Sequence, residues 1–328
     1  MLPGEINFIS RSSSNILKLI AAFLIVLHHY CQYLCANNIS DNFIVKFFAA
    51  FVGYIVVSLF FFLSGYGLSE SENKRKSDTF ISFARRRLIS VYFPFIIINL
   101  ITLFSYQVLN IKHYTLIEAI NNITGISLID SVTWFVRIIL LFYIFFYISY
   151  KMDSKRLRII VLSLFTIAYI LICIFNNYFP TMYVTILAFP IGVITSVYKN
   201  NIQNIKLDHK FIITCLLVYT LTLLLIIILY KYKFTNTVNM LISVLAIPIF
   251  ITILRIIDKI SFVKALSVGS VSYIIYLVHN KIFTIYKWID NNISLSLYLT
   301  LVIIISILLE VIIKKLTSFL FKSSSKQQ

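Results

Sequence analysis

Long apolar runs separated by short polar segments fill the chain between residues 16 and 313. Each run is about 17 to 25 residues long, the length that an α-helix needs to cross the hydrocarbon core of a bilayer. The runs lack the apolar/polar alternation that builds membrane β-strands. The pattern predicts an all-α membrane protein with about ten transmembrane helices, over residues 16–34, 43–68, 88–109, 133–150, 159–175, 182–198, 211–230, 237–257, 266–289 and 295–313.

Composition and charge agree with this prediction. The chain is 60% hydrophobic and 12% charged, whereas soluble domains carry about 25% charged residues. Its net charge of +17 is also typical of nucleic-acid-binding proteins, but the basic residues cluster in short loops between apolar runs, as membrane topology requires. Counted by loop, 22 Lys and Arg residues fall on one side of the membrane and five on the other, so both termini are expected in the cytoplasm.

No internal repeat and no second domain are visible. We therefore expect one membrane domain over residues 1–328, with no cleavable signal peptide and no soluble extracytoplasmic domain. The longest segment between spans, residues 110–132, is expected to face outward. Within it, residues 114–129 are either an interfacial amphipathic helix or a loop.

The first predicted span carries a polar stripe. At about 100° per residue, Arg11, Asn15 and Lys18 fall within about 40° of the azimuth of His29, which lies about 16 Å deeper than Lys18. His28 points about 100° away. Polar groups within a bilayer are costly, so the stripe indicates a functional site. His29 is a candidate general base, and the alternative is a histidine that packs against a neighbouring helix.

A second histidine lies in the ninth predicted span. Ser272, Tyr276 and His279 are spaced four and three residues apart and share one helix face. Because this span also runs outward from the cytoplasm, His279 reaches a depth similar to that of His29. The sequence does not show whether the two helices are neighbours.

Three further groups have both a functional and a structural interpretation. Arg137, just after Trp134, either extends to the interface or binds an anionic or sugar substrate. The cluster 85–87, all arginine, serves topology and would also suit a ligand with several phosphates. Ser64 and its neighbouring glycines in FFFLSGYGL favour close helix packing, or alternatively a backbone site for a ligand.

Metal and disulfide chemistry are not indicated. The four cysteines lie in or beside apolar runs and form no Cys-x-x-Cys pair, so we expect small buried hydrophobic residues. Although Cys31 and Cys35 are four residues apart, no histidine or acidic residue completes a ligand set. We therefore predict no metal site.

Taken together, these motifs resemble the acyltransferase-3 family of integral-membrane acyltransferases, which modify extracytoplasmic carbohydrates. The resemblance covers essentially the whole chain. In the first span it selects His29 over His28, although Asn15 stands where the family has an acidic residue and Lys18 where it has arginine. The corresponding residues are Arg11, Asn15, Lys18, Ala21, Val26 and His29; FFFLSGYGL at 60–68; Arg85, Arg86, Arg87, Tyr92 and Pro94; Trp134, Phe135 and Arg137; and Ser272, Tyr273, Tyr276, Leu277 and His279.

The resemblance implies an enzyme of the bacterial cytoplasmic membrane that uses acyl-CoA, usually acetyl-CoA, as co-substrate and needs no further cofactor. The acceptor would be a hydroxyl of a cell-surface polysaccharide on the outer side. His29 would be catalytic. The donor would be bound by Arg11, Lys18, Ser64, Arg85, Arg86 and Arg87, and the acceptor or the developing charge by Trp134, Arg137, Ser272, Tyr276 and His279.

Two other functions compete with this one. A transporter or flippase for a lipid-linked sugar would also use intramembrane His and Arg, but it favours pairs of broken helices in two related halves, which the sequence lacks. A polysaccharide polymerase would need a long outer catalytic loop. The longest outer segment is short and its acidic residues, Glu118 and Asp130, are too far apart in sequence to suggest a carboxylate pair.

Overall fold

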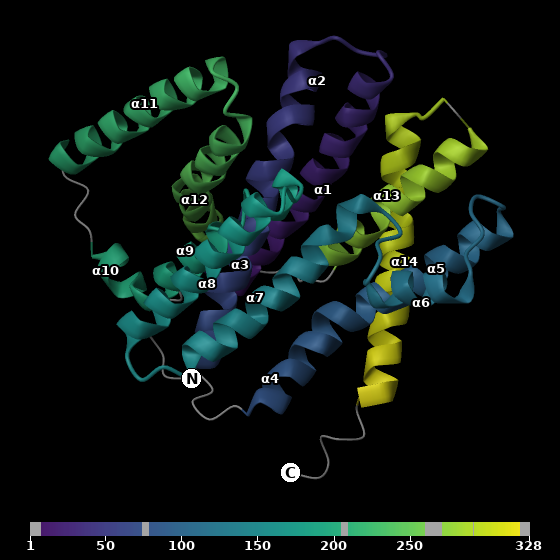
Figure 1. Ribbon diagram of the computed structural model, residues 1–328, viewed down its shortest axis with the longest axis horizontal. Coiled ribbons are helices and arrows are strands. Elements are labelled where there is room, and N and C mark those ends of the chain that lie inside the picture. The colour runs from purple at the N-terminus through teal and green to yellow at the C-terminus, as the bar shows by residue number, and fades with distance from the viewer. Residues whose placement is uncertain (1–7, 74–78, 205–208, 260–270, 291, 322–328) are drawn as a thin grey trace. The chain divides into compact units, whose positions relative to one another are not determined.

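The computed structural model describes residues 8–73, 79–204, 209–259, 271–290 and 292–321, in which all regular secondary structure is helical. Figure 1 labels the α-helices. The elements in chain order are α1 (Arg11–Ala36), α2 (Phe43–Phe47), η1 (Phe48–Val52), α3 (Gly53–Asn73), α4 (Phe80–Arg87), η2 (Leu88–Tyr92), α5 (Phe93–Val108), α6 (Leu116–Thr124), η3 (Ser131–Thr133), α7 (Trp134–Tyr150), α8 (Lys155–Phe175), η4 (Pro180–Met182), α9 (Ala188–Val197), α10 (Lys199–Gln203), α11 (His209–Lys231), α12 (Thr235–Lys259), α13 (Val271–Ile289) and α14 (Leu295–Phe321).

Seven helices in the described residues are long and apolar enough to cross a membrane. Large apolar side chains such as Phe104, Leu171 and Ile304 remain exposed on them, as expected where lipid replaces water. The all-helical membrane fold is thus confirmed, whereas ten spans and cytoplasmic termini remain predictions. The predicted spans 182–198, 211–230 and 266–289 are not among the seven, and residues 266–270 of the last lie outside the described residues.

The boundary predicted at residue 182 is wrong. Residues 180–182 form a 3₁₀ turn, residues 183–187 are turns, and α9 begins only at Ala188. Pro190 agrees with this later start, because proline lacks the N–H of a helix interior and is best tolerated in the first turn. Starting at Ala188 places Pro190 in that first turn.

Two of the long helices contain π-helical turns. The segment η1 joins α2 to α3, and η2 joins α4 to α5, so each set reads as one helix, over 43–73 and 80–108. The arginines at 85–87, which directly precede the predicted span 88–109, therefore lie on the same continuous helix as that span. A π-helical turn accommodates an extra residue within an α-helix, and such turns are frequent at functional sites.

The chain divides into two compact units. The first comprises Met1–Lys18, Ala50–Ser77 and Phe142–Ser267, and its α3 packs against α9 and α12. Gly65 and Gly192 allow the α3/α9 contact, because a Cβ on Gly65 would overlap the backbone carbonyl of Phe189 and one on Gly192 that of Phe62. The packing interpretation of the Ser-Gly motif is therefore confirmed for Gly65.

The second unit comprises Leu19–Ala49, Asp78–Leu141 and Val268–Gln328. Its α13 packs on α14 and α5, and most of its side chains from Ser272 to Ile282 are buried. At the α13/α14 contact the fully buried Tyr298 donates its hydroxyl to the carbonyl of His279 at 3.2 Å. Contacts with α14 and α5 therefore fix the part of α13 that carries His279.

The segment 110–132 of the second unit contains the helix α6, so the helical alternative is correct. Thr115 and Glu118 cap its N-terminus reciprocally, and Gly125, with a φ of 80°, ends it in the left-handed conformation. Tyr92 of η2 donates its hydroxyl to the carbonyl of Thr124 at 2.8 Å, and Asn99 of α5 donates to that of Asn122 at 2.9 Å. These two bonds tie the segment to the α4–η2–α5 helix.

Candidate active site

His29 lies half-buried in the C-terminal half of α1. Its Nδ1 is 2.9 Å from Oε1 of Gln32, about one turn further along the helix. The Gln32 amide nitrogen donates to the Ala49 carbonyl at 3.3 Å, which leaves the amide oxygen facing the imidazole. Because that oxygen can only accept, we assign the imidazole proton to Nδ1 and the lone pair to Nε2. In this tautomer Nε2 of His29 is available as a base.

His279 faces His29 from α13. The two rings are stacked, with their centroids 5.2 Å apart and an angle of 24° between the planes. The Nδ1 of His279 lies 3.1 Å from the Ile275 carbonyl oxygen and 2.8 Å from that of Tyr276, so it also carries the proton. The two histidines predicted at similar depth are therefore neighbours, and both present Nε2 as an acceptor.

The Nε2 of His279 is buried and has no hydrogen-bond partner among the described residues. A buried acceptor left unpaired costs about 1–3 kcal/mol, so native proteins rarely tolerate one without a functional reason. A hydroxyl that donates to this nitrogen would remove the penalty. The position of the unpaired acceptor beside His29 marks the pair as the candidate active site.

A third imidazole completes the cluster. His28 is buried, and its ring meets that of His29 edge to face with centroids 4.8 Å apart. Its Nδ1 is 2.7 Å from the Phe48 carbonyl oxygen. In the part of the chain that the structure describes, no three His, Cys, Asp or Glu side chains are placed to hold a metal ion. The side chain of Cys215 lies outside the described residues.

The π-helical turns supply backbone acceptors to this region. Phe48 and Ala49, which receive the bonds from His28 and Gln32, are the first two residues of η1. In η2, the carbonyl of Val91 accepts the Tyr273 hydroxyl at 2.8 Å. Single π-helical turns inside α-helices are frequent at functional sites. Both turns therefore hold residues around the histidine pair in place.

Among the acceptor-side candidates of α13, Tyr276 contacts the start of α7. Tyr276 donates its hydroxyl to the Val132 carbonyl at 2.6 Å, and its ring lies edge to face with Phe135, with centroids 5.7 Å apart. Arg137 is half-buried and donates through Nη2 to the carbonyl of Ile126 in the segment 110–132. Its Nε–H has no partner among the described residues. Trp134 is half-buried beside Phe135, and Ser272 is buried.

The donor-side candidates fall in both units. Helix α1 is continuous, so Arg11, Lys18 and His29 lie on one helix as predicted. Arg11 is exposed, whereas Lys18 and Ser64 are half-buried. In the second unit, the guanidinium of Arg87 lies over the Phe83 ring, 5.5 Å from its centroid; Arg85 is exposed and Arg86 is half-buried.

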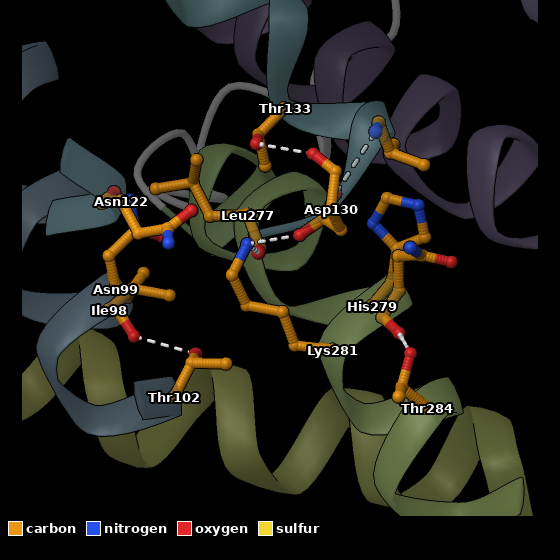
Figure 2. A network of polar contacts seen from close by, with 12 residues as sticks. Ile98, Asn99, Thr102, Asn122, Asp130, Thr133, Leu277, His279, Lys281 and Thr284 are labelled. Carbon is orange, nitrogen blue, oxygen red and sulfur yellow. Dashed lines mark hydrogen bonds and ion pairs between the residues drawn. The ribbon is translucent and has the colours of Figure 1, made fainter. Parts of the chain in front are cut away.

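The sequence did not identify three residues close to this site, Gln32, Asp130 and Lys281. Asp130 and Lys281 form a buried ion pair, with 2.6 Å between Oδ2 and Nζ (Figure 2). They are 151 residues apart in the chain, so no local pattern pairs them. A lysine inside an apolar span is nevertheless expected to pair with an acidic side chain or a carbonyl. The position of Lys281 in such a span was therefore the one sequence feature that indicated a partner.

The chain was also compared with known proteins. A family model described as an acyltransferase domain matches residues 11–315. The matched segment includes all the candidate residues of both the donor and the acceptor side. No match was found among curated proteins or among solved structures.

Proposed function

Since the chain belongs to the acyltransferase-3 family, we propose that it moves an acyl group, most simply acetyl, from cytoplasmic acyl-CoA to a hydroxyl of an extracytoplasmic or lipid-linked cell-surface polysaccharide. Family membership identifies a membrane acyltransferase, and the identities of donor and acceptor are our proposal. The observation that carries it is the stacked pair of His29 and His279, because both rings hold a proton on Nδ1 and turn a basic Nε2 toward a potential hydroxyl.

His29 would act as general base or as nucleophile. In direct transfer, its Nε2 takes the hydroxyl proton while the hydroxyl oxygen bonds to the thioester carbon. The carbon–sulfur bond then breaks, and the imidazolium returns the proton to the leaving CoA thiolate. In the alternative, Nε2 itself attacks the thioester carbon, the carbon–sulfur bond breaks, and CoA leaves as the thiolate while an acyl-imidazole forms. The hydroxyl oxygen then bonds to the acyl carbon, the carbon–Nε2 bond breaks, and the hydroxyl proton passes to the CoA thiolate. Both routes use the same lone pair, which Gln32 orients.

The remaining acceptor-side residues would have different roles. A neutral His279 with its proton on Nδ1 cannot donate from Nε2, so it would accept a hydrogen bond from the sugar and would not stabilise an oxyanion. Arg137 keeps N–H donors beyond its bond to Ile126 and is the better candidate for stabilising the negative charge on the carbonyl oxygen. Trp134, Ser272 and Tyr276 would contribute to acceptor binding.

The phosphates of CoA would be bound by basic side chains. Arg85, Arg86 and Arg87 offer planar guanidinium groups, which match phosphate oxygens in pairs. Lys18 would supply a compact charge on the same helix as the catalytic imidazole, with Arg11 at its start. Ser64 would contribute from α3.

Transfer of a labelled acetyl group to polysaccharide distinguishes an acyltransferase from a transporter or flippase. Purified protein in nanodiscs is incubated with [¹⁴C]acetyl-CoA and surface polysaccharide prepared from cells that lack the protein. We expect label on the polysaccharide and stoichiometric release of CoA thiol. If the polysaccharide remains unlabelled while the protein moves a lipid-linked sugar across the bilayer, the flippase alternative is correct.

A further inference from the structure

The ion pair between Asp130 and Lys281 is almost fully removed from solvent. Its side chains are 6% and 3% exposed. Lys281 also donates to the Leu277 carbonyl at 2.9 Å, and the second carboxylate oxygen of Asp130 accepts the Val132 N–H at 3.0 Å. Burial of two charges is costly and is tolerated when attraction and additional hydrogen bonds compensate both partners. Here each partner has such an additional bond.

The pair connects two parts of the candidate site. Asp130 caps η3, which contacts α13 and leads directly into α7 with Trp134 and Arg137. Lys281 lies two residues after His279 on α13. A second bond, from the Tyr276 hydroxyl to the Val132 carbonyl, reaches the same turn from three residues before His279. Figure 2 shows Asp130 between Lys281 and Thr133.

We propose that the Asp130–Lys281 ion pair is a positioning device that fixes the turn 130–133 against α13, and so holds the acceptor-binding residues of α7 in register with His279. This inference rests on the proposed function. Apolar contacts are non-directional, whereas this pair is directional, because each carboxylate oxygen has its own donor. Neither residue is assigned a bond to the substrate; both act through the turn.

A double variant removes the ion pair without stranding a charge. In Asp130→Asn/Lys281→Met, the Asn oxygen can still cap Val132, and Met keeps the length of the lysine stem. Replacing both members of a buried ion pair is tolerated far better than removing one. The single variant Lys281→Met leaves a buried carboxylate and serves only to show that the pair is formed. The matched control is Asp41→Asn/Lys46→Met, the same change at an ion pair whose side chains are 95% and 54% exposed.

Two readouts test the inference. Hydrogen exchange of residues 126–135, followed by mass spectrometry, reports on the turn and needs no activity. Steady-state transfer of [¹⁴C]acetyl to the polysaccharide reports on positioning. We expect faster exchange in the double variant and an acceptor KM about tenfold or more above wild type, since small misplacements weaken reaction geometry strongly. The KM of the double variant for acetyl-CoA should equal that of wild type. The control variant should match wild type in hydrogen exchange and in both KM values.

The inference is overturned by unchanged exchange in a folded double variant, by unchanged acceptor KM, or by equal rises in both KM values. A wild-type protein that transfers no acyl group would instead overturn the proposed function and with it this role in transfer. The exchange result then reports separately on whether the ion pair holds the turn.

Discussion

At the scale of single residues, the site depends on which nitrogen of each imidazole carries the proton. Backbone and amide oxygens decide this for His28, His29 and His279, since each Nδ1 faces an oxygen acceptor. His29 differs from the other two because its acceptor is a side chain, Gln32. Substitution at Gln32 therefore changes the orientation of the base without touching the base itself.

Gln32→Leu should lower kcat by about ten- to a hundredfold, the usual effect of losing a group that orients a functional histidine. Without an oxygen at Nδ1, the imidazole can rotate or change tautomer. Gln32→Glu is the matched variant, because a carboxylate also accepts from Nδ1–H and should retain most of the activity. Rates are measured with labelled acetyl-CoA. Equal loss in both variants would contradict an orienting role.

The sequence predicted the individual candidates better than their connections. His29 and His279 could be chosen because polar residues are rare in apolar spans, and helix geometry gave them a similar depth. Their stacking could not be predicted, because the sequence does not show which helices are neighbours. Gln32 could not be recognised, because a glutamine near the end of a span looks like an ordinary interfacial residue. The Asp130–Lys281 pair was missed because its members are distant in sequence and only the packing of η3 on α13 brings them together.

At the scale of elements, helix contacts and helix ends follow from a few residues. Most spans were predicted from apolar length alone, but the start of α9 depended on Pro190, and the π-helical turns left no recognisable pattern. Close approach of α3 and α9 depends on two glycines, and α6 depends on its cap. Each can be tested with a substitution whose control lies nearby.

Gly65→Ala should destabilise the protein by about 1–3 kcal/mol, the usual cost of overpacking a tight contact. The added methyl group would overlap the carbonyl of Phe189, which is backbone and cannot move aside cheaply. Gly67→Ala on the same helix is the control: nothing lies within 4 Å of its added Cβ, and alanine favours helix by about 1 kcal/mol. Thermal unfolding in detergent gives both values. A Gly65→Ala protein as stable as Gly67→Ala would contradict the packing described.

The cap of α6 should depend on pH. Hydrogen bonds from the Thr115 backbone and hydroxyl, with Lys112 nearby, lower the pKa of Glu118. A carboxyl whose pKa is lower in the folded state contributes stability above its unfolded pKa and loses it as the pH falls through the folded value. Amide exchange in residues 116–119, corrected for intrinsic rates, should therefore quicken on acidification. Glu118→Gln should abolish this dependence; an unchanged dependence would assign it to another group.

At the scale of the whole molecule, an all-helical membrane chain of the acyltransferase-3 family carries a histidine pair within its second unit. Membrane character and family were predictable because apolar length and a few ordered motifs extend over the entire chain. The prediction of ten spans remains open, because helices such as α9 are apolar yet shorter than the seven candidate spans in the described residues. The central claim is that His29, one of three neighbouring histidines, is the catalytic residue. It is tested by comparing a substitution at His29 with the same substitution at His28.

The most direct measurement is [¹⁴C]acetyl transfer to polysaccharide by purified His29→Ala and His28→Ala proteins in nanodiscs, at matched protein amounts and with thermal midpoints recorded. We predict that His29→Ala abolishes transfer, because the Nε2 lone pair that takes the proton or the acyl group is gone. His28→Ala should retain transfer, reduced at most by local repacking. Full transfer by a folded His29→Ala protein would contradict the account.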